Sequence, residues 1–323
     1  DQLCKKIKKA GGAEQYNANE KYAEAVSVAA EACAEDTKGQ TCYICTQALH
    51  WKTKEGLVRM CACRGTAGFA HVSCLAEQAK ILFQEAEENN LDWDVKNPRW
   101  VRWYTCSLCK QQYHGVVNCA MGWAVWKTYV GRSEWDEVQR LAMTALGNGL
   151  YNAKRFDEEL VVREAELATE ERLGVKEEGE ILITRGNLAI CYYNLGQLDE
   201  ALSMQREVYA GWQNWGDCLA QDIAVCNLTE YLVAAREFEE AQSLAREKLP
   251  AIIDRHGPDD ALTLEVRTWY ARALFRAGDA AEDDVSEAEE VLEDVLLRSK
   301  RVLGDSHPDT ERAREFLEEV RSA

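Results

Sequence analysis

The side chains most suited to chemistry in this chain are cysteines and one histidine between positions 42 and 109. They form four close pairs: Cys42 with Cys45, Cys61 with Cys63, His71 with Cys74, and Cys106 with Cys109. Thiolate and imidazole are preferred ligands of Zn²⁺, and a pair two or three residues apart can hold one metal from a single turn. Four pairs supply eight ligands, which two tetrahedral zinc ions require. The spacing therefore predicts two zinc sites.

The ligand order is four cysteines, one histidine and three cysteines, and at this spacing it resembles the RING-CH (RING variant) family of ubiquitin ligases. The resemblance rests on Cys61-Ala62-Cys63-Arg64-Gly65-Thr66, on the seven residues between Cys63 and His71, on Cys74-Leu75, and on the segment from Tyr104 to Tyr113. A PHD finger shares the ligand order. PHD fingers, however, usually separate the second pair by more residues and place the histidine closer to it, so the RING-CH interpretation is favoured.

The resemblance implies a cross-brace, in which alternate pairs share a metal. Site one would contain Cys42, Cys45, His71 and Cys74, and site two Cys61, Cys63, Cys106 and Cys109. Both sites are filled by protein ligands, which is typical of structural rather than catalytic zinc. Structural zinc contributes on the order of 10 kcal/mol or more to folding. Such a contribution would stabilise a module with little apolar content.

The resemblance also implies which residues meet the partners of a RING-type ligase. Ile44 and Leu108, each between two ligands, would contact the ubiquitin-conjugating enzyme, and Lys110 would brace ubiquitin. The family commonly carries a tryptophan three residues after the leucine that follows the sixth ligand. Here that leucine is Leu75 and the position is Gln78, so binding of the enzyme is in question.

From about residue 131 the chain repeats itself. The segment 152–158 is echoed at 194–200 and 234–240, and the pairs Leu173-Gly174, Trp215-Gly216, His256-Gly257 and Leu303-Gly304 recur at intervals of 42, 41 and 47 residues. A period of this length with two helices per unit predicts a helical solenoid. Asn187-Leu188-Ala189 and the closing segment from Leu303 to Thr310 resemble tetratricopeptide repeats of the kinesin-light-chain type, over residues 138–323.

The repeat register predicts which positions are buried and which line a groove. Small residues at equivalent positions should let helices approach: Gly147, Ala189, Thr229 and Ala271 on first helices, and Ala201, Ala241 and Ala288 on second helices. Residues one, four and five places after the first set should line a peptide groove: Asn148, Tyr151, Asn152, Tyr193, Asn194, Glu230, Arg272, Phe275 and Arg276. Amides can bond to a peptide backbone, and the arginine pair would favour an acidic residue. The alternative is a polar surface without a ligand.

Other segments are predicted to be helical. A helix should follow Gly11-Gly12 and lead into the zinc module, and another should run from Leu75 to about Glu88 and stop at Asn89-Asn90. Trp93, Trp100 and Trp103 are expected to pack over the zinc knuckles, or alternatively to form a methyl-lysine cage. The fold is expected to be mostly α: an N-terminal helical segment over 1–40, a RING-CH zinc domain over 41–114, a connecting helix over 115–137 and a repeat solenoid over 138–323.

Charge and cysteine usage limit the partners. The net charge of −18 divides into +2 for residues 1–130 and −20 for the remainder. An acidic body repels phosphate backbones, which argues against nucleic acid, and no apolar run is long enough to cross a membrane. Thirteen cysteines, seven of them committed to zinc, favour a reducing compartment. We expect a cytoplasmic location, with a nuclear one as the alternative.

Three functions fit the sequence. The leading hypothesis is a RING-CH-type E3 ubiquitin ligase that binds a ubiquitin-charged conjugating enzyme through the zinc domain and a protein substrate through the solenoid. The first alternative is a non-catalytic scaffold in which two structural Zn²⁺ ions only stabilise an interaction module. A PHD-like reader of histone tails is the second alternative.

Overall fold

The computed structural model describes residues 2–174, 178–216, 218–278, 281–305 and 307–322. These residues form fourteen α-helices and one 3₁₀ helix: α1 (Gln2–Ala10), α2 (Ala13–Ala32), α3 (Val72–Glu88), α4 (Trp93–Trp100), η1 (Val101–Trp103), α5 (Gly115–Tyr129), α6 (Glu137–Asn152), α7 (Phe156–Leu173), α8 (Glu178–Asn194), α9 (Leu198–Trp215), α10 (Cys218–Ala234), α11 (Phe238–His256), α12 (Ala261–Arg276), α13 (Glu282–Val302) and α14 (Pro308–Ser322). The predicted mostly α fold is confirmed.

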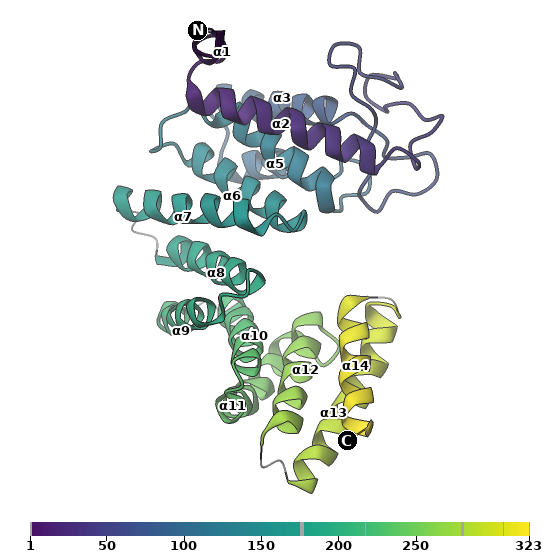
Figure 1. The fold of residues 1–323 in the computed structure, drawn as a ribbon, viewed down its shortest axis with the longest axis vertical. Coiled ribbons are helices and arrows are strands. Elements are labelled where there is room, and N and C mark those ends of the chain that lie inside the picture. Colours follow the sequence, from purple (N-terminus) through teal and green to yellow (C-terminus); the bar gives the residue numbers. More distant parts are fainter. Residues whose placement is uncertain (1, 175–177, 217, 279–280, 306, 323) are drawn as a thin grey trace. The chain divides into compact units, whose positions relative to one another are not determined.

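The helices group into two compact units, Asp1–Leu173 and Gly174–Ala323 (Figure 1). The first unit contains the zinc-ligand segment and also the hairpin of α6 and α7, the first pair of the predicted repeats. The domain boundary expected near residue 138 stays a prediction.

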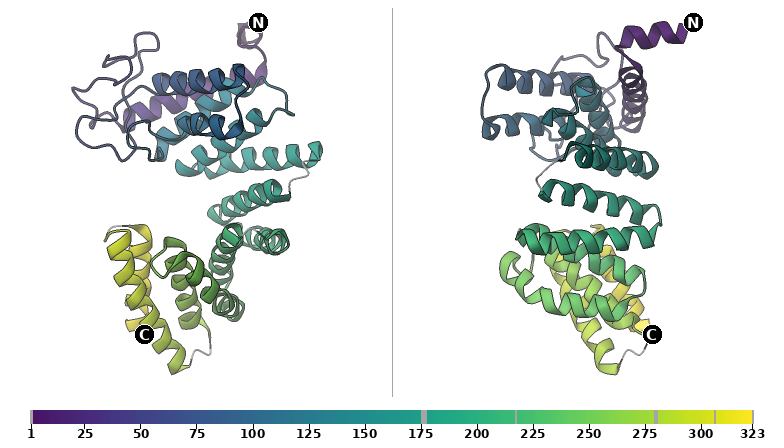
Figure 2. Two further views of the ribbon diagram at one scale, coloured as in Figure 1. Left: turned by 180° about the vertical axis from the view of Figure 1, so that it is seen from behind. Right: turned by 90° about the vertical axis from the view of Figure 1, so that its left-hand side faces the viewer.

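Helix α5 lies at the centre of the first unit, between α2, α3 and α6 (Figures 1 and 2). Its residues from Val117 to Val125 are all buried. A helix that is apolar on every side is stable only when neighbours cover it all round, which accounts for the uncharged composition of this segment. Glycines let α5 and α6 meet backbone to backbone: a Cβ at Gly122 would lie 3.0 Å from the Ala145 carbonyl oxygen, and one at Gly149 would lie 2.9 Å from that of Asn118.

Aromatic rings fill the space between α3, α4 and α5. Trp100 and Trp103 are buried, and their ring centroids lie 5.7 and 5.8 Å from that of Tyr129. Phe83 of α3 meets Trp100 edge-on at 5.0 Å. Trp93 is 41% exposed, so the expectation that it packs over the zinc knuckles is wrong. Trp100 and Trp103 share one buried core with the predicted ligands Cys42, Cys74 and Cys106.

The hairpin of α6 and α7 encloses a buried charge. Arg163 of α7 is 1% exposed, and its guanidinium donates to Glu166 at 2.9 Å and to the side-chain oxygen of Asn148 at 2.5 Å. Glu159 lies 3.5 Å from it on the other side. A Cβ at Gly147 would fall 2.5 Å from the Arg163 Cζ. The small residue predicted at position 147 therefore makes room for an arginine rather than for close helix contact.

The second unit consists of helical pairs α8–α9, α10–α11 and α12–α13, closed by α14 (Figure 2). The predicted small positions Ala189, Thr229 and Ala271 are completely buried, as are Ala201, Ala241 and Ala288. Tyr193 of α8 stacks on Tyr231 of α10, with 4.4 Å between the ring centroids. The amphipathic repeat read from the sequence is therefore the pattern by which these helices bury one another.

Three hairpins share one turn. Lys154, Gly196 and Arg236 occupy equivalent positions with positive φ angles of 57°, 76° and 65°. The next residue donates its N–H to a carbonyl five residues earlier: Arg155 to Leu150, Gln197 to Tyr192, and Glu237 to Leu232, at 3.0, 2.9 and 2.8 Å. This pattern is a Schellman motif, which usually places glycine at the left-handed position. Only one of the three turns does so here.

None of the helices within the described residues is long and apolar enough to cross a membrane.

Candidate metal centre

Two turns of the first unit have the same backbone structure. In the turn Cys42–Cys45, the N–H of Cys42 donates to the Gln47 carbonyl at 3.0 Å and the N–H of Thr46 donates to the Cys42 carbonyl at 2.8 Å. In the turn Cys106–Cys109, the N–H groups of Cys106 and Lys110 make the equivalent bonds at 2.9 and 3.0 Å. The residue after each second cysteine, Thr46 and Lys110, has a positive φ of 62° and 63°. We call these turns the first and second knuckle.

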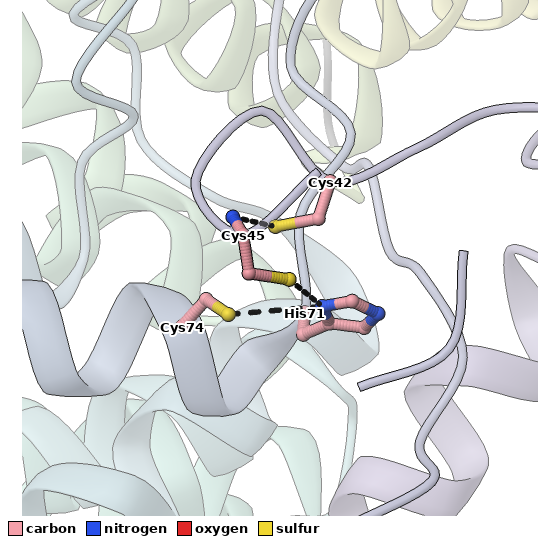
Figure 3. Close-up of side chains that lie close together, drawn as sticks. All are labelled: Cys42, Cys45, His71 and Cys74. Atoms are coloured by element: carbon pink, nitrogen blue, oxygen red, sulfur yellow. Dashed lines mark hydrogen bonds between the residues drawn. The ribbon is translucent and has the colours of Figure 1, made fainter. Parts of the chain in front are cut away.

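The first knuckle meets the start of α3. Figure 3 shows Cys42, Cys45, His71 and Cys74 converging on one point, and their ligand atoms all lie within 4.8 Å of one another. The Nδ1 atom of His71 lies 3.3 Å from the Cys45 sulfur and 3.7 Å from that of Cys74. With zinc–sulfur and zinc–nitrogen bonds of about 2.3 and 2.0–2.1 Å, a tetrahedral site requires about 3.6 Å between such atoms. The cluster therefore has the dimensions of a zinc site.

His71 is held in the orientation that a metal ligand needs. Its Nε2 faces the Ala48 carbonyl at 3.4 Å, so that nitrogen can carry the proton and leave the Nδ1 lone pair towards the cysteines. Burial lowers the pKa of His71, which favours the neutral, ligating form. The first turn of α3 is fixed by Glu55, whose carboxylate accepts from the N–H and the hydroxyl of Ser73, both at 2.8 Å.

The second knuckle meets Cys61 and Cys63, and the ligand atoms of this cluster also lie within 4.8 Å of one another. The sulfurs of Cys63 and Cys106 are 3.7 Å apart. This is far longer than a disulfide bond of about 2.05 Å and close to the sulfur–sulfur edge of about 3.8 Å in a tetrahedral zinc site. The residues of both clusters are thus grouped as the cross-brace resemblance implies. Metal binding itself stays a proposal.

Gly68 adjoins the second cluster, and sequence reasoning did not single it out. It has a φ of +87°, and a Cβ there would lie 2.6 Å from the Cys63 Cβ and 2.9 Å from the Cys63 sulfur. Only glycine fits both the backbone and the space. The signal in the sequence was a second glycine three residues after Gly65, but only the fold shows which of the two touches a ligand.

The burial of the thiols also favours a bound cation in the clusters. Burial raises the pKa of Cys61 and of Cys74, so a thiolate without a counter-charge is unfavourable at either position. A divalent cation among the sulfurs would supply that charge. The donor set of sulfurs and one imidazole suits zinc, and all four positions of each cluster are filled by protein.

Comparison with known sequence families agrees with this geometry. Residues 42–91 match the RING-variant domain, and residues 181–214 and 271–309 match the tetratricopeptide repeat. The chain carries a RING-variant domain and tetratricopeptide repeats. The match to the RING-variant domain ends before Cys106 and Cys109, which the fold brings to Cys61 and Cys63.

The chain also resembles solved structures at low sequence identity. The kinesin-light-chain TPR-like repeats of Podosopora anserina are 18% identical, with a TM-score of 0.45 over 72% of this chain and 97% of theirs. A variant of that protein gives 18% identity and a TM-score of 0.46 over 72% and 98%. BtubC of P. vanneervenii is 12% identical, with a TM-score of 0.39 over 78% and 88%. No curated protein matches the chain in sequence.

The two knuckles of the RING-variant domain are joined by a hydrogen bond of 2.8 Å between the hydroxyls of Tyr43 and Ser107. Ile44 and Leu108, the residues expected to meet a conjugating enzyme, follow directly in the chain. Leu108 is 49% exposed, and Ile44 is half-buried against the core. The ammonium of Lys110 donates to the Ser107 carbonyl at 2.6 Å. No pattern in the sequence indicated the Tyr43–Ser107 bond.

The amide side chains predicted to line a peptide groove have partners in their own helices. Asn152 and Asn194 end α6 and α8, and each Nδ2 donates to the carbonyl four residues earlier, Asn148 or Ile190, at 2.8 Å. The equivalence predicted for Asn152 and Asn194 is therefore present, but both amides bond to the last turn of a helix. Asn152 and Asn194 are both exposed, so their side-chain oxygens can still accept a hydrogen bond from another molecule.

The predicted arginine pair also has a partner. Arg272 and Arg276 of α12 both pair with Glu319 of α14. With Tyr193, Arg236, Trp269 and Phe316 they line a pocket of about 440 Å³ in the second unit. Asn148, Tyr151 and Asn152 instead line a pocket of the first unit. Six of the predicted groove residues thus fall into two pockets, one in each unit, whereas Asn194, Glu230 and Phe275 line neither.

Proposed function

We propose that this chain is a RING-type E3 ubiquitin ligase whose RING-variant domain holds two structural Zn²⁺ ions. The match of residues 42–91 to the RING-variant domain carries the proposal. It is supported by two four-residue clusters with the dimensions of zinc sites. Zinc in such sites would lock the knuckles together and take no part in bond making.

The chain's part in ubiquitin transfer would be to orient the reactants. Ile44 and Leu108 would bind the conjugating enzyme, and Lys110 would hold ubiquitin against it so that the thioester faces a substrate lysine. Positioning of this kind can lower the activation free energy by several kcal/mol without a general base or covalent intermediate. The Tyr43–Ser107 bond supports it, because that bond fixes one knuckle relative to the other.

The repeats would hold the protein target. In the second unit, Arg236, Arg272 and Arg276 line one pocket with the rings of Trp269 and Phe316. Within the described residues, Glu319 is the carboxylate that pairs with Arg272 and Arg276. An acidic residue of a target would bind here by pairing with Arg236 or by replacing Glu319.

A non-catalytic scaffold is the second candidate, and two observations favour it. Gln78 stands where the family commonly has tryptophan, and Lys110 already donates to a carbonyl of its own knuckle. In that case the zinc sites would only stabilise an interaction module.

Discharge of a ubiquitin-charged conjugating enzyme by the purified chain tests the proposal. Ile44→Ala should slow discharge about tenfold, since a buried aliphatic contact is worth about 1.5 kcal/mol, while zinc content stays unchanged. Leu49→Ala is the matched control, because Leu49 is an exposed leucine of the same domain outside the knuckles, at 59% exposure. No discharge by the parent across a panel of conjugating enzymes would favour the scaffold.

A further inference from the structure

The pocket of the first unit lies between the end of the zinc-ligand segment and the first repeat helix. It has a volume of about 410 Å³. Its lining includes Trp93, Asn97 and Trp100 of α4, Asn118 of α5, and Tyr151 and Asn152 of α6. A pocket of this size can enclose a few residues of a peptide. Neither the RING-variant domain nor the repeats form it alone.

Asn118 is the feature of this pocket that points to a ligand. It is 5% exposed, its side-chain amide has no hydrogen-bond partner within the described part of the chain, and the polar atoms of that amide reach the open space of the pocket. An amide that has no partner in its own chain bonds to water or to a ligand. An asparagine side chain can donate to a carbonyl and accept from an N–H at once. A peptide backbone offers both groups.

The remaining lining sets the character of the ligand. Within the described residues, Asp, Glu, Lys, Arg and His are absent from it, although 29% of the chain is charged. A charged side chain placed here would lose its hydration without gaining a counter-charge. The rings of Trp93, Trp100, Tyr104 and Tyr151 offer flat apolar faces instead.

We infer that this pocket binds an uncharged, extended peptide segment that contains proline. Proline rings pack well on aromatic faces, and a polyproline II backbone leaves its carbonyls free for amide donors. Asn118 would bond to the backbone while Trp93 and Tyr151 hold the proline rings. The inference deepens the proposed function by giving the chemistry of a target. It rests on that function only in treating the bound peptide as part of a ubiquitination target. Binding of the peptide itself requires no ubiquitin transfer.

Fluorescence anisotropy with the full chain tests the inference. The probe is a fluorescein-labelled, end-blocked peptide of three Pro-Pro-Leu units. One comparison peptide has aspartate in place of every leucine, and another has alanine in place of every proline. The parent should bind the neutral proline peptide at least about tenfold more tightly than either comparison peptide.

Three variants locate the site. Trp93→Ala should weaken binding about tenfold, whereas Trp135→Ala, at an exposed tryptophan outside the pocket, should not change it. Asn118→Leu should weaken binding about tenfold without lowering the melting temperature, because the amide has no hydrogen bond within the described residues to lose. A purely structural asparagine would give a lower melting temperature instead.

The inference is overturned if the neutral peptide does not bind, if the aspartate peptide binds equally well, or if Trp93→Ala and Asn118→Leu both bind like the parent. Discharge of the conjugating enzyme is measured separately, without peptide. Discharge with no peptide binding would contradict this inference alone, and binding with no discharge would contradict the proposed ligase alone.

Discussion

Replacing Gly68 with alanine should weaken one metal site and spare the other. The new Cβ would lie 2.6 Å from the Cβ of Cys63, where non-bonded carbons need about 3.5 Å or more. Cys63 must therefore move by about 1 Å, while zinc–ligand distances tolerate only about 0.2 Å. If four ligands share about 10–16 kcal/mol, losing one costs about 3 kcal/mol, or about a hundredfold in zinc affinity.

Competition with a chromophoric chelator measures this loss. The parent should contain two zinc ions by elemental analysis. Gly68→Ala should release one of them at about a hundredfold lower chelator concentration. Gly65→Ala is the matched control: Gly65 also has a positive φ, +61°, but a Cβ there would meet nothing within 4 Å. Equal zinc release from the two variants would refute the reasoning, since backbone strain alone would then explain both.

Three further predictions concern stability. Lys154→Gly and Arg236→Gly should each stabilise the chain by about 1 kcal/mol in denaturant unfolding, because glycine removes the penalty of a left-handed residue. Gly147→Ala should destabilise it by about 3 kcal/mol, since the new Cβ would displace the guanidinium of Arg163 from its buried carboxylates. Burial, and then the nearby charge of Glu265, raise the pKa of Glu230 to about 7. The folded state therefore holds this proton more tightly than the unfolded state, and stability should fall as pH rises from about 4.5 through 7. The effect is on the order of 3 kcal/mol, and Glu230→Gln should remove this contribution.

Each of these has a control. Lys248→Gly, inside α11, should lower stability by about 1 kcal/mol, because glycine is unfavourable within a helix. If Lys154→Gly and Arg236→Gly lowered it as well, the left-handed turns would not be strained. An unchanged unfolding midpoint for Gly147→Ala would mean that Arg163 can move freely. An unchanged pH profile for Glu230→Gln would place the titrating group elsewhere.

Local features could be read from the sequence alone. The spacing of a ligand pair depends on a single turn, and a repeat can be recognised because its sequence recurs. The RING-variant resemblance and the mostly α fold with tetratricopeptide repeats, both predicted from such patterns, are confirmed. Helix α3 begins at Val72 and ends before Asn89, close to the prediction, because its apolar spacing and its stop signal are both local.

The rest depended on which distant segments meet. Glu319 lies 47 residues from Arg272 along the chain. No pattern in the repeat indicated that α14 supplies the carboxylate that pairs with the two arginines. Asn152 and Asn194 are equivalent in the repeat because they sit at the same place in a hairpin. An amide at that place can also bond to the last turn of its own helix. The equivalence of Asn152 and Asn194 therefore could not show whether they bind a peptide or end their helices.

Because α5 follows the second knuckle and meets α6 backbone to backbone at Gly122 and Gly149, the two ligand clusters and the first repeat hairpin share one hydrophobic core. Unfolding of that core should therefore be cooperative from the clustered cysteines through to the hairpin. The second unit buries a separate core of its own. The chain should therefore melt in two transitions, and a chelator should shift only the one that belongs to the first unit.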